Sequence, residues 1–251
     1  MKCERNDRWF VYNTAQCTRW LCLLVLAGIG MYVGVVVAAP GDLDPGFGDH
    51  GRVQLPFDGG DDLYVARAGP AIVQQSDGRV LVARTDWAGS DGMDSEVAVA
   101  RLLPDGTLDP EFGIGGFVRL RFRGVEAAGV GGLALLPDRR LVVVGYSIKA
   151  WLGGGMGQYP DLDTGFALVR TDGSLDPGGF GNGGRLALDL PAAGRSDYAV
   201  ATVALEDGRI IVAGTADSNS GTRFFMVRMT TQGNLDPSFG ERDGFAWAGS
   251  I

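Results

Sequence analysis

Cysteine and histidine are nearly absent from this chain of 251 residues. The three cysteines lie at positions 3, 17 and 22, so nothing after position 22 can form a disulfide, a thiolate metal site or a cysteine nucleophile. His50 is the single histidine, which excludes metal centres built from two or more histidines. No nucleophile, base and orienting residue recur together across the chain. We therefore predict no metal, no cofactor and no catalytic residue.

Positive charge is also scarce. The chain has 22 basic and 30 acidic residues, and residues 1–38 hold four of the basic ones and two of the acidic ones. The remainder is strongly acidic and repels phosphate backbones, which excludes nucleic acid as a partner. It has no basic amphipathic segment for binding anionic lipid. With 45 % hydrophobic residues it can nevertheless bury a sizeable core.

The N-terminus carries an apolar run at residues 20–39, preceded by four cations and followed by small residues. This pattern predicts a signal peptide, cleaved after Ala38, or an N-terminal membrane anchor over residues 1–38. The run is longer than most signal sequences and long enough to span a bilayer, so both alternatives stay open. Either one exports residues 39–251, to the periplasm, the cell surface or the medium. Only an uncleaved segment at residues 20–39 would contact the membrane.

Residues 39–251 form an internal repeat. A segment that we call the LDP box, Gly-x-Leu-Asp-Pro followed by Phe-Gly, occurs at residues 41–51, 106–116, 173–184 and 233–244. Between the boxes, an Asp-Gly-Arg or Asp-Arg-Arg turn and a strand ending near Arg recur in the same order. The predicted repeats cover residues 41–105, 106–172 and 173–232, with a partial fourth at residues 233–251.

Each repeat contains four short apolar or alternating segments, which indicate β-strands. Taken in chain order, the first strands are expected at residues 52–55, 117–122 and 185–190, and the second at 71–73, 133–136 and 200–205. The third are expected at residues 80–83, 141–144 and 210–213, and the fourth, on the outside, at 97–102, 166–170 and 224–229. A two-residue Asp-Gly or Asp-Arg turn is expected between the second and third strands. The prediction is an all-β, β-propeller-like array of four-stranded antiparallel blades, three complete and one partial.

The Leu-Asp-Pro-x-Phe-Gly box, the Asp-Gly-Arg hairpin and the Phe-Ala-Leu-Val-Arg strand at residues 166–170 resemble the delta-60 repeat family of bacterial exported proteins. The resemblance covers residues 41–251. It implies a β-propeller-like array and no common activity. The sequence departs from the pattern at Asp138-Arg139, which lacks the turn glycine, and at Gly178-Gly179, which adds a residue to the third box.

The repeated polar and aromatic residues are interpreted as structural. Aspartates at turns cap backbone N–H groups, and calcium loops are rejected because the ligand spacing is wrong. These aspartates are Asp44, Asp109, Asp176 and Asp236 in the boxes and Asp77, Asp138 and Asp207 in the hairpins. The box phenylalanines, expected to plug the space between units, are Phe47, Phe112, Phe180 and Phe239. Arg101, Arg170 and Arg228 share one register and are expected to pair with the box aspartates.

Features that differ between repeats are the candidates for a binding site. The connections between the third and fourth strands, at residues 84–95, 146–164 and 215–222, differ in length, and two of them carry large aromatic residues. Trp87, Trp151 and Tyr159 can stack on sugar rings, which makes a glycan a candidate ligand. The leading hypothesis is an exported, non-enzymatic module for binding or scaffolding. The alternatives are a glycan-active enzyme with paired carboxylates and a membrane-anchored component of an envelope complex.

Three complete units are fewer than the four to eight blades of a closed propeller. Three alternatives remain open at this point: an open arc, a ring closed by two copies of the chain, or part of a longer array.

Overall fold

The computed structural model describes residues 41–57, 70–87, 95–122, 127–152, 159–181, 183–190, 196–218, 221–240 and 243–250. The chain divides into two units, Met1–Leu43 and Asp44–Ile251. The predicted signal peptide or anchor at residues 1–38 lies outside the described residues. Within the described ranges, no helix has the length and apolar character needed to cross a membrane.

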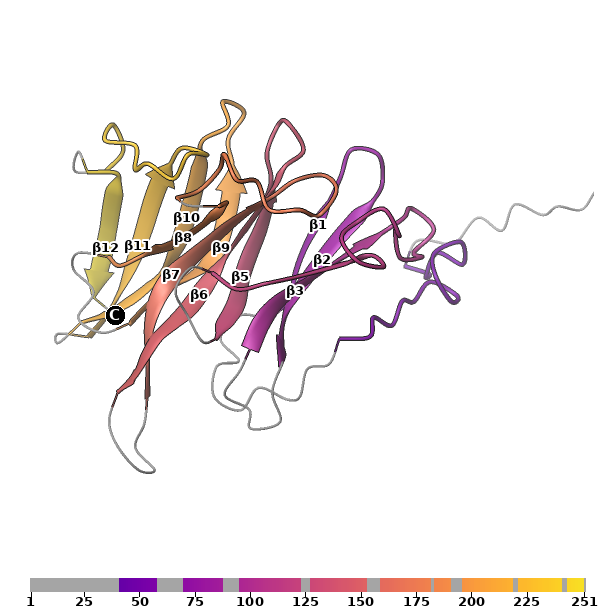
Figure 1. The fold of residues 1–251 in the computed structure, drawn as a ribbon, viewed down its shortest axis with the longest axis horizontal. Coiled ribbons are helices and arrows are strands. Elements are labelled where there is room, and N and C mark those ends of the chain that lie inside the picture. Colours follow the sequence, from indigo (N-terminus) through magenta and orange to yellow (C-terminus); the bar gives the residue numbers. More distant parts are fainter. Residues whose placement is uncertain are drawn as a thin grey trace, which may run out of the picture. The chain divides into compact units, whose positions relative to one another are not determined.

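The second unit is built from three four-stranded antiparallel sheets (Figure 1), so the predicted all-β fold is confirmed. The first sheet has the order β1 (Ala71–Gln74), β2 (Val80–Trp87), β3 (Ser95–Leu102) and β4 (Phe117–Leu120). The second has the order β5 (Ala128–Leu135), β6 (Leu141–Leu152), β7 (Tyr159–Val169) and β8 (Arg185–Leu188). The third has the order β9 (Ser196–Ala204), β10 (Ile210–Ser218), β11 (Gly221–Met229) and β12 (Phe245–Ser250).

The sheets are offset by one strand from the sequence repeats. The strand after each box was predicted to begin a repeat, yet β4 pairs with β3, β8 with β7 and β12 with β11. The strand that follows a box therefore completes the preceding sheet as its edge strand. The strands predicted as outer ones, β3, β7 and β11, instead lie second from the edge. Residues 52–55 form no strand; only Arg52 makes isolated bridges, to Gly48 and Asp49.

The hairpin turns between the first and second strands of each sheet contain three residues, not the two predicted. We call the end of the sheets that carries these turns the turn end. In the first, Gln75 N donates to Arg79 O, and Gly78 N donates to Gln75 O. Gly78 has a φ of 87°, the left-handed conformation that a three-residue hairpin loop requires at its last position. In the second sheet Arg139 takes this position with a φ of 69°, a conformation that costs a side-chain-bearing residue about 1–2 kcal/mol.

The hairpin at the other end of the second sheet is much more regular than predicted. Residues 146–164 were interpreted as a long loop, but β6 runs to Leu152 and β7 begins at Tyr159, with paired residues along most of that length. Residues 84–87 and 215–218 likewise extend β2 and β10. The polar residues in these stretches, such as Lys149 and Asp163, hide the strand periodicity because they interrupt the run of apolar residues.

Each sheet has two apolar faces, which we name by chain order. The forward face packs on the next sheet and the backward face on the preceding one. Leu81, Ala83, Val97 and Val99 on the forward face of the first sheet share a core with the backward face of the second. Val142, Val144 and Phe166 on the forward face of the second sheet share a core with the backward face of the third. The same pair of faces is therefore used twice, and burial of these strands on both sides explains their near-continuous apolar sequence.

Candidate functional site

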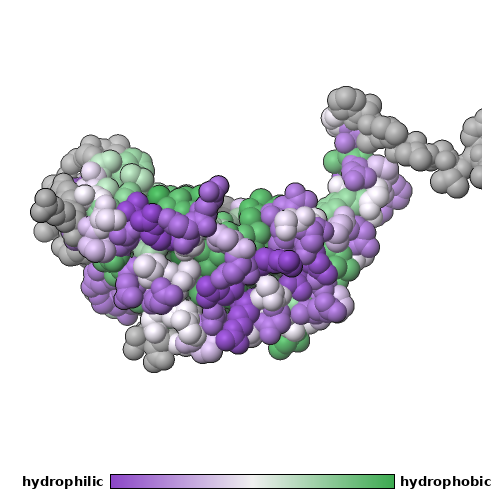
Figure 2. Space-filling model, turned by 90° about the horizontal axis from the view of Figure 1, so that it is seen from above, coloured by the Kyte–Doolittle hydropathy of each residue, from purple (hydrophilic) through white to green (hydrophobic). Residues whose placement is uncertain are grey.

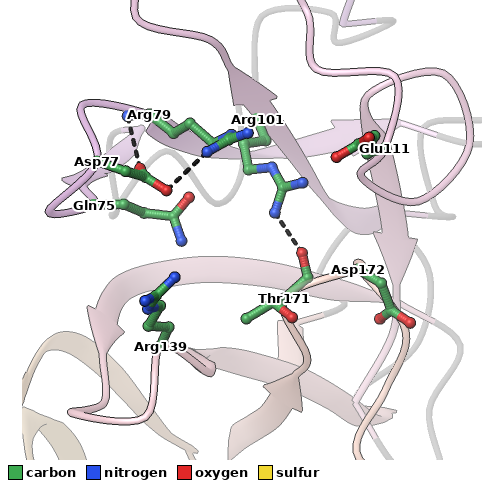
Figure 3. Close-up of a pocket in the computed structure, with 8 residues that line it drawn as sticks. All are labelled: Gln75, Asp77, Arg79, Arg101, Glu111, Arg139, Thr171 and Asp172. Carbon is green, nitrogen blue, oxygen red and sulfur yellow. Dashed lines mark hydrogen bonds and ion pairs between the residues drawn. The ribbon is translucent and has the colours of Figure 1, made fainter.

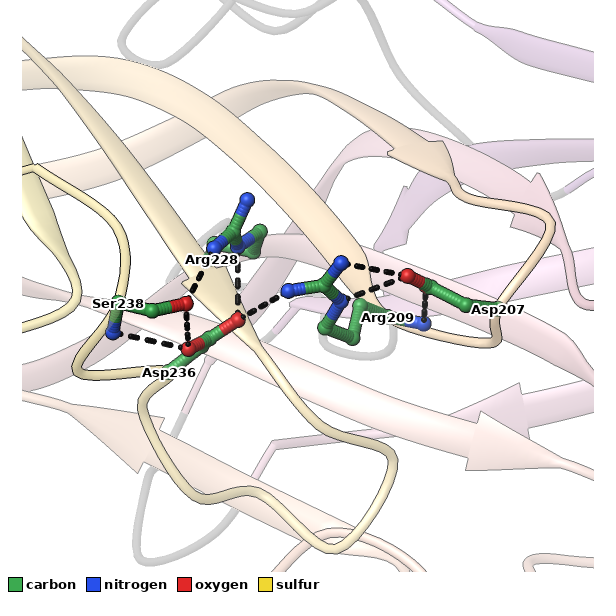
Figure 4. A network of polar contacts seen from close by, with 5 residues as sticks. All are labelled: Asp207, Arg209, Arg228, Asp236 and Ser238. Carbon is green, nitrogen blue, oxygen red and sulfur yellow. Dashed lines mark hydrogen bonds and ion pairs between the residues drawn. The ribbon is translucent and has the colours of Figure 1, made fainter.

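A network of arginines and aspartates joins each hairpin turn to its LDP box, and it is drawn for the third sheet in Figure 4. Arg209 contacts Asp207 in its own turn and Asp236 in the box, with Nη1–Oδ2 at 2.7 Å. Asp236 also accepts a hydrogen bond from Arg228 Nε at 2.8 Å and two from Ser238. The Ser238 and Arg209 hydrogen bonds lower the pKa of Asp236 well below its usual range. The Asp236 carboxylate thereby connects the turn, the box and β11.

The first sheet repeats this arrangement, and the second sheet repeats it with one arginine displaced. Asp109 receives Arg79 Nε and Arg101 Nε, each at 2.9 Å, and Asp176 receives Arg140 and Arg170. Burial favours the neutral form of Asp109, but the hydrogen bonds from Glu111 and the two guanidinium groups outweigh burial and lower its pKa. All the predicted turn aspartates accept the backbone N–H two residues later; they are Asp44, Asp77, Asp109, Asp138, Asp176, Asp207 and Asp236.

The predicted register of the three arginines is wrong for Arg170. Leu102, Val169 and Met229 each pair with the first residue of the preceding strand, so Leu168 is the structural equivalent of Arg101 and Arg228. Arg170 follows β7 and reaches Asp176 from outside the sheet, at 3.3 Å. The sequence contains a signal for this shift. Arg170 precedes the leucine of the next box by five residues, whereas the other two arginines precede it by seven.

The box phenylalanines divide into two pairs. Phe112 and Phe180 are fully buried, whereas Phe47 and Phe239 are half-buried. The guanidinium of Arg101 lies 4.7 Å from the ring centroid of Phe112, and that of Arg228 lies 4.9 Å from that of Phe239. The two buried rings belong to the inner boxes, which lie between neighbouring sheets, and the two half-buried rings belong to the first and last boxes.

A polar cavity of about 380 Å³ lies at this turn end, between the first and second sheets (Figure 3). Arg101 crosses it to donate to the carbonyl of Thr171. Arg139 and Gln75 point toward each other across it. A comparable cavity lies one repeat later, beside Arg140 and Arg209. Figure 2, seen from the end that carries the turns, shows hydrophilic residues over much of this surface. Because the networks and cavities recur from sheet to sheet, we interpret the residues at this end as structural.

The opposite end of the sheets carries a cluster of three carboxylates, the one such group among the described residues. The first sheet has a smaller charged group at this end, in which Arg119 pairs with Asp86 and Glu96. One carboxylate oxygen of each of Asp163, Asp189 and Asp197 lies within 4.8 Å of the others. Lys149 Nζ is 2.8 Å from Asp189 and 3.6 Å from Asp163. The cluster lies where β7, the segment after β8 and the start of β9 meet, so it bridges the second and third sheets.

The three carboxylates have different environments. Asp197 is only 1 % exposed and accepts hydrogen bonds from Thr164 N and Oγ1 and from Leu190 N. Burial raises the pKa of Asp197 to about 6, although these hydrogen bonds favour its charged form. Burial also raises the pKa of Asp163, against the pull of Lys149. Asp189 is largely exposed, and its hydrogen bond raises the pKa of Lys149. The cluster can therefore offer carboxylate acceptors and one ammonium donor to a polar ligand.

The predicted aromatic residues lie on strand ends, not in loops. Trp87 is the last residue of β2, and Trp151 and Tyr159 are near the tip of the β6–β7 hairpin. Trp151 pairs with Pro160, and Leu152 pairs with Tyr159. The side chains of these three aromatic residues lie outside the described part of the structure. Along the backbone, Tyr159 and Asp163 belong to one strand, so the hairpin connects the acidic cluster to the predicted aromatic positions.

Sequence reasoning missed the acidic cluster because its members are distant in the chain and come from separate elements. The sequence signal that could have indicated the cluster is an aspartate at a position where the other repeats have no acidic residue. Asp197 pairs with Ala216 in β9–β10, whereas Ala128 takes the corresponding place in β5–β6, opposite Ser147.

A family model described as a domain of unknown function (DUF5122) beta-propeller matches residues 75–112 and 205–239. Both matched segments begin at a hairpin turn and end in an LDP box. The chain thus has a β-propeller-like fold of repeated four-stranded antiparallel sheets. Among curated proteins, no match to the chain was found.

Proposed function

We propose that this β-propeller-like repeat protein is an exported binding module whose ligand site is the outer end of the β6–β7 hairpin, and that the ligand class is a glycan. The observation that carries the proposal is the cluster of Lys149, Asp163, Asp189 and Asp197, because no other group of described residues brings three carboxylates together. Features shared by every repeat serve the common fold, whereas one specific site needs residues that differ between repeats.

The chemistry of the hairpin matches a sugar. Carboxylates and an ammonium group can accept from and donate to hydroxyl groups, and Trp or Tyr rings can cover the apolar face of a pyranose. Lys149, Asp161 and Asp163 lie on the two strands that carry Trp151 and Tyr159. Trp87, at the end of β2, is the third aromatic residue assigned to the binding end.

The test is a screen of bacterial and plant glycans, repeated for each hit with Trp151→Ala, Tyr159→Ala and Trp87→Ala. We expect each substitution in the site to weaken binding at least about fivefold, which corresponds to about 1 kcal/mol. The matched control is Ile114→Ala, a 90 % exposed residue at the turn end. Binding by the Trp151→Ala, Tyr159→Ala double variant at the level of the control contradicts the proposal.

The second candidate is a glycan-active enzyme, and the raised pKa of Asp197, to about 6, favours it, because a general acid needs such a carboxyl. We rank it second because Asp197 is buried and its oxygens are already engaged by Thr164 and Leu190. Turnover of any glycan that is abolished by Asp197→Asn, in a variant with an unchanged melting temperature, would reverse this order.

Export rests on the sequence pattern of residues 1–38 and has its own measurement. We expect the protein recovered outside the cytoplasm to begin at or near Ala39, as measured by intact mass. A mass that includes residues 1–38, in the membrane fraction, assigns the segment as an anchor and favours a role in an envelope complex.

A further inference from the structure

The forward face of the third sheet is apolar and uncovered among the described residues. Val203, Phe224 and Met226 are 52 %, 47 % and 43 % exposed, and Ile211 and Ala213 between them are half-buried. Pairing within the sheet places all five side chains on one face, since Val203 is opposite Ile211, Met226 opposite Ala213 and Phe224 opposite Thr215. Contiguous apolar exposure of this kind marks an interaction surface.

The equivalent positions in the other two sheets are fully covered. Strand register makes Ile211 equivalent to Leu81 and Val142, and Met226 equivalent to Val99 and Phe166. Those four residues are at most 2 % exposed, because the next sheet of the chain packs on them. In the first and second sheets this face is covered by the next sheet. The third sheet presents the same face to solvent among the described residues.

Among the described residues, the complementary surface on the first sheet is largely open. Ile72 on its backward face is 70 % exposed, and Val80 and Val82 beside it are half-buried. In the second sheet the equivalent residues, Leu133, Leu141 and Val143, are buried against the first sheet. Within the described residues, each half of the sheet-to-sheet interface therefore occurs once without its partner surface.

We propose that the forward face of the third sheet binds the backward face of the first sheet of a second copy of this chain. The contact continues the interface already present between the first and second and between the second and third sheets. It joins two different surfaces, so it is heterologous and runs head to tail. Two copies bring together six sheets, a number within the four to eight blades of closed propellers.

Residues 48–57 compete for part of this contact, since Gly48 N donates to Asp105 O just as Gly113 N donates to Asp172 O one repeat later. Phe57 stacks edge-on against Phe117 at 5.8 Å, and Arg84 lies over its ring. By box alignment Phe57 is the equivalent of Phe122, which continues β4 and packs over Gly165 of the second sheet. In the associated state the fourth box and β12 of the second copy take the position that residues 48–57 hold, so these residues are released.

The test measures the mass in solution by sedimentation, using the protein recovered from expression of the full chain. We expect association of the unaltered protein at micromolar concentration. Phe224→Glu combined with Met226→Glu on one face, and Ile72→Glu on the other, are each expected to weaken association at least tenfold. Ile114→Glu is the control, because Ile114 is more exposed than any of these residues but lies on neither face. Unchanged melting temperatures establish that the variants fold.

Mixing separates this proposal from a symmetric dimer. The Phe224→Glu, Met226→Glu variant retains an intact backward face, and the Ile72→Glu variant retains an intact forward face, so their mixture is expected to form a heterodimer. Phe57→Ser, which loosens the competing segment, is expected to strengthen association several-fold. A monomeric unaltered protein, a mixture that stays monomeric, or association unchanged by Phe57→Ser would overturn the proposal.

Discussion

Arg209 and Asp236 are separated by 27 residues in the chain, yet the Arg209 guanidinium donates to the Asp236 carboxylate at 2.7 Å, while Arg228 approaches the same oxygen from β11 at 2.8 Å. One carboxylate shared by two guanidinium groups thus connects a hairpin turn, a strand and an LDP box. In a protein whose residues after position 22 include no cysteine, this shared ion pair is the recurring polar link within each sheet.

Removing the shared carboxylate should be costly where it is most buried. Asp109→Ala leaves the guanidinium of Arg101, which is almost completely buried, without its carboxylate partner. We expect a loss of about 3–5 kcal/mol in the free energy of unfolding, measured by chemical denaturation. The control is Asp105→Ala, an exposed turn aspartate bonded to Thr107, for which a loss of about 1 kcal/mol is expected. Equal losses for both variants would contradict the role assigned to Asp109.

The box phenylalanines should follow their burial. Phe112→Ala empties a site that is 1 % exposed, and we expect it to cost about 3–5 kcal/mol in thermal or denaturant unfolding. Phe47→Ala and Phe239→Ala, at half-buried sites, should cost clearly less. A cost below about 0.5 kcal/mol for Phe112→Ala would show that its ring is not part of the core.

The turn at Arg139 should be improved by glycine. Arg139 has a φ of 69°, so Arg139→Gly relieves the strain of a left-handed residue and is expected to raise stability by about 1 kcal/mol. The reverse change, Gly78→Ala at a φ of 87°, should lower stability by about 1 kcal/mol or more, since the new Cβ also lies 3.3 Å from Pro104. Melting temperatures of the two variants should therefore move in opposite directions.

Stability should fall between about pH 4 and pH 6 because of Asp197. Its pKa in the folded protein is raised to about 6 from a reference value of 3.8, so the folded state holds this proton more tightly than the unfolded state. The associated stability is fully present below pH 4 and is lost as the pH rises through 6, by up to about 3 kcal/mol.

The comparison that isolates this effect is Asp197→Asn, measured beside the unaltered protein across the same pH range. The difference in unfolding free energy between the two proteins should change over pH 4–6 and stay constant above pH 7. The box aspartates do not interfere, because their lowered pKa values place their titration at more acidic pH. A constant difference from pH 4 to pH 8 would show that Asp197 titrates normally.

The all-β fold could be predicted because the apolar strands, the turn glycines and the boxes repeat together. What could not be predicted is which neighbour a strand joins: nothing in residues 117–120 distinguishes pairing with β3 from pairing with β5. Only the packed structure shows that β4 closes the sheet before it.

The acidic cluster escaped prediction for a related reason. Asp163, Asp189 and Asp197 meet because the second sheet packs on the third, and such proximity leaves no local pattern in the chain. The turn aspartates could be identified, because an Asp that caps the N–H two residues later is a purely local arrangement.

The one-strand offset also determines where the chain can be divided. Cutting at a repeat boundary, for example after residue 232, would remove β12 and leave the backbone of β11 as an open edge, competent to pair with any free strand. Cutting between β4 and β5, or between β8 and β9, leaves every sheet intact. A whole sheet, from its first strand to the strand after the next box, can therefore be added or removed without exposing a new strand edge. This structural unit begins and ends at other residues than the repeat that is visible in the sequence.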